Sequence, residues 1–141
     1  MRKIEHIGIA VKDLAASNTL FEQLLGQPPY KEEEVASEGV KTSFFMNGPN
    51  KIELLEATNP DSPIAKFLEK KGEGIHHIAF DVEDIVVEIA RLKKEGFIVL
   101  NEVPKKGADN KLVAFLHPKS TNGVLIELCQ EIIEQQLFIR K

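Results

Sequence analysis

Two histidines and two glutamates occupy corresponding places in two similar stretches of this 141-residue sequence, and together they could bind a divalent metal ion. The histidines open the segments HIGIAVKDL and HIAFDVEDI, 71 residues apart, and the glutamates stand in KIELLEA and LIELCQE. Imidazole and carboxylate groups suit borderline cations such as Co²⁺, Zn²⁺, Mn²⁺, Ni²⁺ and Fe²⁺. A six-coordinate ion with four protein ligands would keep two positions for water or substrate. The candidate ligands are His6, Glu53, His77 and Glu127.

Alternating patterns predict that these side chains share one open face. On the side of His6 the next residue is the small Gly8, whereas the other side carries bulky aliphatic residues. Glu53 is flanked by Ile52 and Leu54, so its carboxylate points away from the aliphatic face. A carboxylate in an apolar strand is costly to bury unless it is paired or binds a metal. A hydrogen-bonded core histidine is the ordinary alternative, but the recurrence of His with Glu in both halves favours a metal site.

The two stretches belong to a larger internal repeat, which predicts the fold class. Each half begins with a strand, continues with a helix that starts at an Asp N-cap and ends at a Gly, and closes with three shorter strands. We therefore predict an α+β fold of tandem βαβββ repeats in one domain, residues 1–141. The predicted parts are strands 4–11, 29–36, 40–46 and 51–57, helices after Asp13 and Asp84 ending at Gly26 and Gly96, and strands 75–82, 97–101, 111–117 and 124–130.

Segments outside these elements complete the domain. Repeat 1 covers about residues 4–57 and repeat 2 about residues 75–130. The connection at 62–72 has helix signals, since Ser62 can cap the helix and Pro63 suits its first turn. The tail, 131–141, fits a short amphipathic helix, a frayed terminus or a partner contact.

Composition excludes several classes of protein. A net charge of −4 and a pI near 5.6 give no electrostatic footprint for nucleic acid. No apolar run approaches the length that spans a bilayer, and the N-terminus lacks a signal-peptide cleavage site, so we expect no membrane association. A single cysteine, Cys129, forms no internal disulfide and fits a reducing, cytoplasmic compartment. Cys129 is expected to be a small buried residue or to border the site, and His76 to lie at the surface or a sheet edge.

At these motifs the sequence resembles the vicinal oxygen chelate superfamily and, within it, the methylmalonyl-CoA epimerases. The segments VAFLHPKSTNGVLIELCQ and DSPIAKFLEKKGEGIHHIAFDV carry the resemblance most specifically, and it covers about residues 4–130. It implies a curved mixed sheet around a metal site, with a divalent ion, Co²⁺ first, on His6, Glu53, His77 and Glu127. It also implies a homodimer and an acyl-CoA substrate.

The implied activity is interconversion of (2R)- and (2S)-methylmalonyl-CoA by α-proton abstraction through a metal-chelated enolate. Glu127 is the expected base on one face; Glu53, Glu38 or a metal-bound water could serve the other. The sequence departs from some relatives, which carry glutamine at the position of Glu53 and a carboxylate near Thr42. Lys119 and Ser120, in the turn before the last strand, are candidates for contact with the substrate carboxylate or the CoA phosphates.

Two other functions stay open at this point. A glyoxalase I-type lactoylglutathione lyase shares the fold, the four-ligand site and enolate chemistry. A non-catalytic small-molecule-binding member of the fold would need no His/Glu quartet. An extradiol dioxygenase fits poorly, because it uses two His and one Glu on iron. The sequence does not choose between methylmalonyl-CoA and ethylmalonyl-CoA as substrate.

Overall fold

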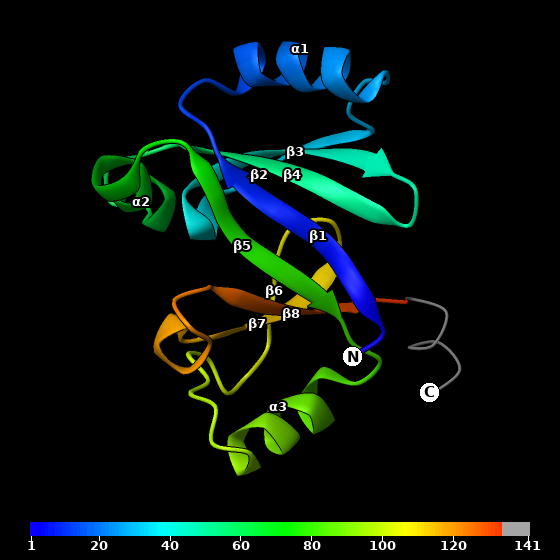
Figure 1. The fold of residues 1–141 in the computed structure, drawn as a ribbon, viewed down its shortest axis with the longest axis vertical. Helices are drawn as coiled ribbons and strands as arrows, with labels where there is room; N and C mark the ends of the chain where they lie inside the picture. Colours follow the sequence, from blue (N-terminus) through cyan, green and yellow to red (C-terminus); the bar gives the residue numbers. More distant parts are fainter. Residues whose placement is uncertain (134–141) are drawn as a thin grey trace.

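One curled sheet of eight strands organises residues 1–133, the part of the chain that the computed structural model describes. The strands follow the order β2-β3-β4-β1-β5-β8-β7-β6, and helices α1 and α3 flank the central pair β1 and β5 (Figure 1). In chain order the elements are β1 (Lys3–Ala10), α1 (Leu14–Leu25), β2 (Lys31–Val35), the 3₁₀ turn η1 (Ala36–Glu38), β3 (Val40–Asn47), β4 (Asn50–Ala57), α2 (Pro63–Lys71), β5 (Gly74–Asp81), α3 (Ile85–Lys94), β6 (Lys105–Lys106), β7 (Lys111–Leu116), the 3₁₀ turn η2 (Pro118–Ser120) and β8 (Ile126–Glu131).

The strand order repeats, as the internal sequence similarity predicted. The first half is ordered β2-β3-β4-β1 and the second β6-β7-β8-β5, and the two halves join through the antiparallel pair β1–β5. β1 pairs with β4 in parallel, and β5 pairs with β8 in parallel. The prediction of an α+β fold with tandem βαβββ units and a curved mixed sheet is confirmed.

The helices begin at the predicted caps. The Asp13 side chain accepts a hydrogen bond from the Ala16 amide, and Gly26 ends α1 with a left-handed φ of 78° that a side chain would disfavour. Asp84 caps α3 in the same way. Ser62 caps α2 by accepting from the Ala65 amide. These caps fix the residue at which each helix begins.

The helices cover the sheet face that points away from the site. α1 packs on Phe45 and Leu54, while α3 packs on Leu116 and Leu128, all at most 2% exposed. Along each strand, the residues next to these four point to the opposite, concave face of the sheet. The aliphatic positions beside Glu53 and Glu127 therefore anchor the helices, and the glutamates face inward.

The predicted strand at 97–101 is wrong. That segment makes only an isolated bridge, between Val99 and Leu116, and the edge strand β6 lies further on. The reason is the side chain of Asn101, which accepts a hydrogen bond from the Phe115 amide at 2.9 Å and donates to the Val113 carbonyl at 3.2 Å. The side-chain amide thus takes backbone partners of β7 that a regular strand would use.

Two further points concern the ends and the surface. Most of the tail lies outside the described residues, apart from the end of β8 and the two residues after it, so its predicted roles stay predictions. Within residues 1–133 no helix is both long and apolar enough to cross a bilayer.

Candidate metal centre

The strand register brings the four candidate ligands to one point. His6 and His77 stand on the paired central strands, where Gly8 of β1 lies opposite His77. On the other side of β1, Gly8 pairs with Glu53 of β4, and the equivalent position of β5, Ala79, pairs with Glu127 of β8. All four candidate ligands are at most 7% exposed.

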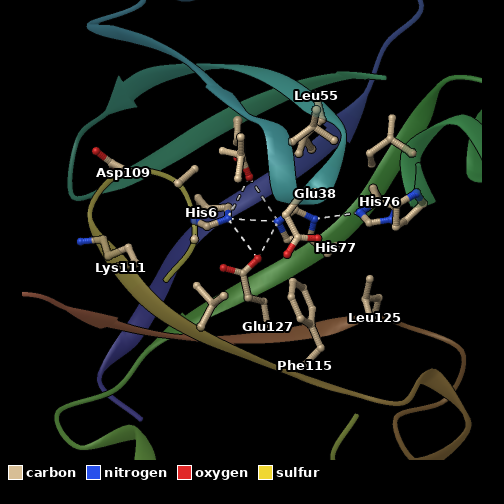
Figure 2. Close-up of a pocket in the computed structure, with 18 of the residues that line it drawn as sticks. His6, Glu38, Leu55, His76, His77, Asp109, Lys111, Phe115, Leu125 and Glu127 are labelled. Carbon is tan, nitrogen blue, oxygen red and sulfur yellow. Dashed lines mark hydrogen bonds and ion pairs between the residues drawn. The ribbon is translucent and has the colours of Figure 1, made fainter. Parts of the chain in front are cut away.

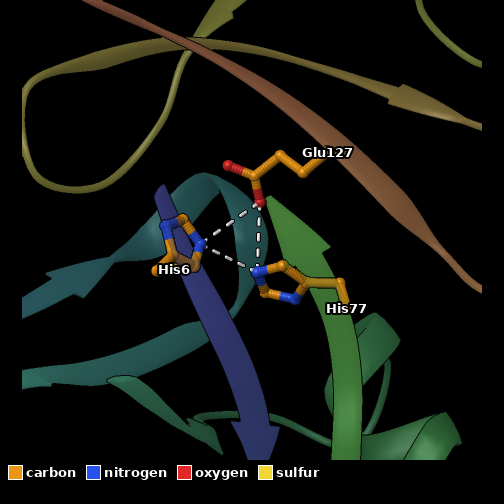
Figure 3. A group of neighbouring side chains, drawn as sticks. All are labelled: His6, His77 and Glu127. Atoms are coloured by element: carbon orange, nitrogen blue, oxygen red, sulfur yellow. Dashed lines mark hydrogen bonds and ion pairs between the residues drawn. The ribbon is translucent and has the colours of Figure 1, made fainter. Parts of the chain in front are cut away.

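Each of the two carboxylates lies close to both histidine Nε2 atoms. The Nε2 atoms of His6 and His77 are 3.0 Å apart. Glu53 Oε1 lies 3.2 Å from His6 Nε2 and 3.4 Å from His77 Nε2. Glu127 Oε1 lies 3.2 Å from His77 Nε2 and 3.8 Å from His6 Nε2. Figure 3 shows His6, His77 and Glu127 pointing toward one another, and these three donor atoms form a group compact enough for a metal ion.

This donor set fits a divalent cation in both chemistry and spacing. Adjacent ligand atoms of an octahedral ion are about 3.0 Å apart when its bonds are about 2.1 Å long. The separations of 3.0–3.8 Å are close to that value. Neutral imidazole and carboxylate are the ligand types that borderline metals prefer.

The electrostatics of the cluster also favour a cation. Burial lowers the pKa of His6, but the negative charge of Glu127 and hydrogen bonds to Glu5 and Glu53 raise it well above its ordinary value. Burial raises the pKa of Glu53, but its contacts with the two histidines outweigh that effect and lower it. Without a metal, the carboxylates therefore hold a proton on the imidazole of His6, and a metal ion would take the place of that charge.

A second layer of side chains orients the two imidazoles. Glu5 Oε1 lies 2.9 Å from His6 Nδ1, and His76 Nδ1 lies 2.9 Å from His77 Nδ1. Glu5 and His76 precede their ligands at equivalent repeat positions. Burial and the neighbouring charge of His77 lower the pKa of His76 to about 4. The expectation of a surface or edge position for His76 is wrong, because its ring lies half-buried in the cavity wall against Phe67 and His77.

The outer oxygen of each candidate ligand carboxylate has its own donor. Thr42 Oγ1 donates to Glu53 Oε2 at 2.9 Å, and Cys129 Sγ donates to Glu127 Oε2 at 2.9 Å. Thr42 and Cys129 are both 0% exposed. Cys129 is thus the small buried residue that was predicted, and it also touches the site. The repeat signalled none of these contacts, because Thr42 and Cys129 differ in type and in position.

A polar network extends from His6 to the loop after β6. Glu5 Oε2 contacts Lys51 Nζ at 3.1 Å, Lys51 contacts Asp109 Oδ2 at 3.0 Å, and Tyr30 donates to the same Asp109 oxygen at 2.7 Å. Burial raises the pKa of Glu5, yet the hydrogen bonds from His6 and Lys51 lower it to about 2. Glu5 therefore stays an anion that accepts from the histidine.

The cluster forms the floor of a cavity of about 380 Å³ (Figure 2). Apolar side chains such as Leu55, Phe115 and Leu125 line its walls, and Glu38 reaches it from the turn between β2 and β3. Lys119 and Ser120 are not among the lining residues; they belong to η2, where the Ser120 hydroxyl donates to the His117 carbonyl.

Comparison with known proteins places this site in a family. Residues 5–115 match the model of the Glyoxalase/Bleomycin resistance protein/Dioxygenase superfamily. The ethylmalonyl-CoA/methylmalonyl-CoA epimerase of Cereibacter sphaeroides is 46% identical over 131 residues, which cover 91% of this chain and 97% of that protein. The human mitochondrial methylmalonyl-CoA epimerase is 40% identical over 91% of this chain and 73% of its own length.

A solved structure of a methylmalonyl-CoA epimerase is also similar to this chain. The Streptomyces coelicolor methylmalonyl-CoA epimerase, in a point variant bound to 2-nitronate-propionyl-CoA, superposes with a TM-score of 0.89 at 36% identity, covering 93% of this chain and 95% of that one. The chain therefore belongs to the glyoxalase/dioxygenase superfamily, which is the vicinal oxygen chelate superfamily, and within it to the family of the methylmalonyl-CoA epimerases. By class it is an isomerase.

Proposed function

We propose that this chain is a metal-dependent epimerase that interconverts (2R)- and (2S)-methylmalonyl-CoA. The observation that carries the proposal is the convergence of His6, Glu53, His77 and Glu127 on the floor of a cavity, in a chain related to methylmalonyl-CoA epimerases over most of its length. The cavity has the size of a small-molecule site.

The four residues would hold one divalent cation, for which Co²⁺ is our first choice. Such an ion supplies a Lewis acid that stabilises negative charge on the thioester oxygen of the substrate. Stabilising charge that develops only in the transition state raises the rate.

The protein's own task is to move a proton between two faces of one carbon. The C–H bond at the α-carbon breaks, its electron pair is delocalised into the thioester as an enolate, and the proton passes to a carboxylate. Return of a proton to the opposite face gives the other epimer. Each acid/base must come within about 3 Å of the α-carbon's proton, directly or through one water.

We assign one acid/base role to Glu127. Its outer oxygen accepts from a thiol, which is a weak donor, whereas the outer oxygen of Glu53 accepts from the hydroxyl of Thr42. The carboxylate of Glu127 is therefore less firmly held and better able to turn toward the substrate. Glu53 is the better candidate for a fixed ligand.

Proton NMR in D₂O tests the proposed reaction. Metal-loaded protein should remove the α-proton signal of methylmalonyl-CoA well above the uncatalysed rate; chelation should abolish the exchange, and added Co²⁺ should restore it. Ethylmalonyl-CoA belongs in the same test because the Cereibacter sphaeroides relative is named for both compounds. Absence of exchange in metal-loaded protein contradicts the proposal, and the hemithioacetal of glutathione is then the next substrate to assay.

Three further expectations accompany the proposal. Lys119 and Ser120, outside the cavity lining, would contact the CoA part of the substrate, so Lys119→Ala should raise KM more than it lowers kcat. The family resemblance supports a homodimer, which light scattering on the purified protein would measure. We expect a cytoplasmic location from the single cysteine, and fractionation of cells tests it.

A further inference from the structure

We propose that Glu38 is the second acid/base of the reaction and serves the face of the α-carbon opposite to the one served by Glu127. The inference rests on the proposed epimerase function. It assigns a catalytic role to a residue that neither binds the metal nor lies on a repeated motif.

The first argument is the position of Glu38 next to an edge strand of the sheet. His6 and His77 stand on the two middle strands of the sheet, whereas β2 and β6 are its two edges. Glu38 follows β2 and forms an ion pair with Lys105 of β6. This pair joins the two edges of the curled sheet, so it lies over the cavity whose floor is the metal centre.

The second argument is that the Glu38 carboxylate belongs to the cavity itself. Glu38 and Lys105 are both lining residues, and Figure 2 draws the Glu38 side chain among those that surround the cavity. A volume of about 380 Å³ suits a small molecule, so a substrate bound at the metal centre lies in the same cavity as Glu38. Glu38 reaches the cavity from the turn after the edge strand β2 and Glu127 from β8, which is far from β2 in the strand order, so the two carboxylates approach the cavity from different elements.

The third argument is that the other carboxylates of the cavity outside the quartet are already engaged. Both oxygens of Glu5 are used, one by His6 and one by Lys51. Asp109 contacts Lys51 and Tyr30 through one oxygen and lies near Lys31 through the other. Proton transfer to either residue would break these hydrogen bonds and ion pairs.

Glu38 differs from them because its Oε2 has no polar side-chain partner within residues 1–133. Among the described residues its only polar side-chain partner is Lys105, through Oε1. The other lysine of the cavity lining is Lys111, and an ammonium group has no lone pair with which to accept a proton. Thr42 is excluded as a base because it is 0% exposed and its hydroxyl donates to Glu53.

The proton balance of the step is simple. For one epimer, Glu38 takes the α-proton, the electron pair of the broken C–H bond enters the enolate, and a proton from the carboxyl group of Glu127 forms the new C–H bond on the other face. Glu38 then releases its proton to water and Glu127 takes one from water. In the reverse direction the two residues exchange roles.

The test is Glu38→Gln, with Glu34→Gln as the matched control. Glu34 is an exposed glutamate of the neighbouring strand β2 and is not a lining residue of the cavity. Both variants, loaded with Co²⁺, would be given (2R)- and (2S)-methylmalonyl-CoA separately in D₂O. Epimerisation and α-proton exchange would be followed for each, and Co²⁺ affinity would be measured by calorimetry.

We expect Glu38→Gln to bind Co²⁺ as the wild type does and to lose epimerisation in both directions by roughly 10²–10⁴-fold, the usual contribution of a general base. Exchange should fall by the same factor for one epimer and stay near the wild-type rate for the other, whose α-proton faces Glu127. Glu38→Asp, which keeps a carboxylate at shorter reach, should recover part of the lost exchange for that same epimer.

Two results would overturn the assignment. One is epimerisation by Glu38→Gln within a few-fold of the wild type. The other is an equal fall in exchange for both epimers, which indicates a structural effect. If the wild-type protein exchanges neither epimer, the proposed function fails instead, and the control variant will show the same absence.

Discussion

The hydrogen bond between Glu5 and His6 allows the role of the second layer to be measured. Glu5 is 3% exposed, and its Oε1 lies 2.9 Å from His6 Nδ1, the ring nitrogen that faces away from the other candidate ligands. A hydrogen bond to a charged group is about twice as strong as a neutral one. Glu5→Gln keeps an acceptor of the same size and removes the charge, so we expect a loss of about 1.4 kcal/mol in Co²⁺ binding, or about tenfold in Kd. Glu5→Ala also removes the acceptor and should cost up to about 100-fold.

Calorimetric titration with Co²⁺, in competition with a chelator of known affinity, measures both variants. Glu34→Gln is the control for a change of one charge at an exposed place, and its Kd should equal that of the wild type. The unfolding temperature of each metal-free variant shows whether the fold is kept. If Glu5→Ala binds Co²⁺ within twofold of the wild type, Glu5 does not orient His6 for the metal and the reasoning is refuted.

Two other predictions follow from the same site. Because the surrounding carboxylates raise the pKa of His6, its imidazole carries a proton in the metal-free protein near neutral pH. Metal must displace that proton, so Co²⁺ affinity should fall as pH decreases between roughly 8 and 5.5, with about one proton released per ion at neutral pH. Calorimetry in two buffers of different ionisation enthalpy measures this proton release. A Co²⁺ affinity that is independent of pH contradicts the prediction. Gly8→Ala would place a methyl group where the His77 imidazole now lies. The ring must then move, and we expect at least about 100-fold weaker metal binding with a nearly unchanged far-ultraviolet circular dichroism spectrum. A Gly8→Ala protein with wild-type Co²⁺ affinity would show that metal binding does not need the His77 ring in this position.

The fold and the inner ring of candidate ligands could be predicted because they depend on local, repeated signals. Strand alternation placed His6 beside Gly8 on one face, and the caps Asp13 and Asp84 marked where each helix begins. The same pattern recurs 71 residues later, so the two histidines could be recognised together as candidate ligands. Such signals need no knowledge of which distant strands are neighbours.

The second layer could not be predicted in this way, because its contacts depend on pairing between strands. Glu5 reaches Lys51, 46 positions away along the chain, only because β1 and β4 lie side by side. His76 was misjudged since its alternation places it opposite His77, whereas its ring turns toward the Nδ1 atom of that neighbour. The error at 97–101 has the same origin: Asn101 replaces backbone pairing with side-chain hydrogen bonds.

The repeat also helps to separate the parts of the site that are symmetric from those that are not. Phe44 and Phe115 are equivalent positions, and each meets its histidine edge-to-face, at ring distances of 6.2 and 6.4 Å. The same offset of 71 relates Glu38 to Asp109, so the duplicated framework provides a carboxylate on each wall. Asp109 is held by Tyr30 and two lysines, whereas Glu38 has Lys105 alone among the residues that the structure describes.

This difference has a consequence for a reaction that must treat two faces of one carbon. A metal floor built from equivalent strands can bind either epimer, but proton transfer needs a group on each face that is free to gain and lose a proton. In the second half we propose that this group is a candidate metal ligand, Glu127, because Asp109 is engaged. In the first half the ligand Glu53 is held by Thr42, and within residues 1–133 the wall residue Glu38 is the one left free. On this proposal the two halves meet the same chemical requirement with residues from non-equivalent positions, and for that reason the repeat alone does not point to the second base.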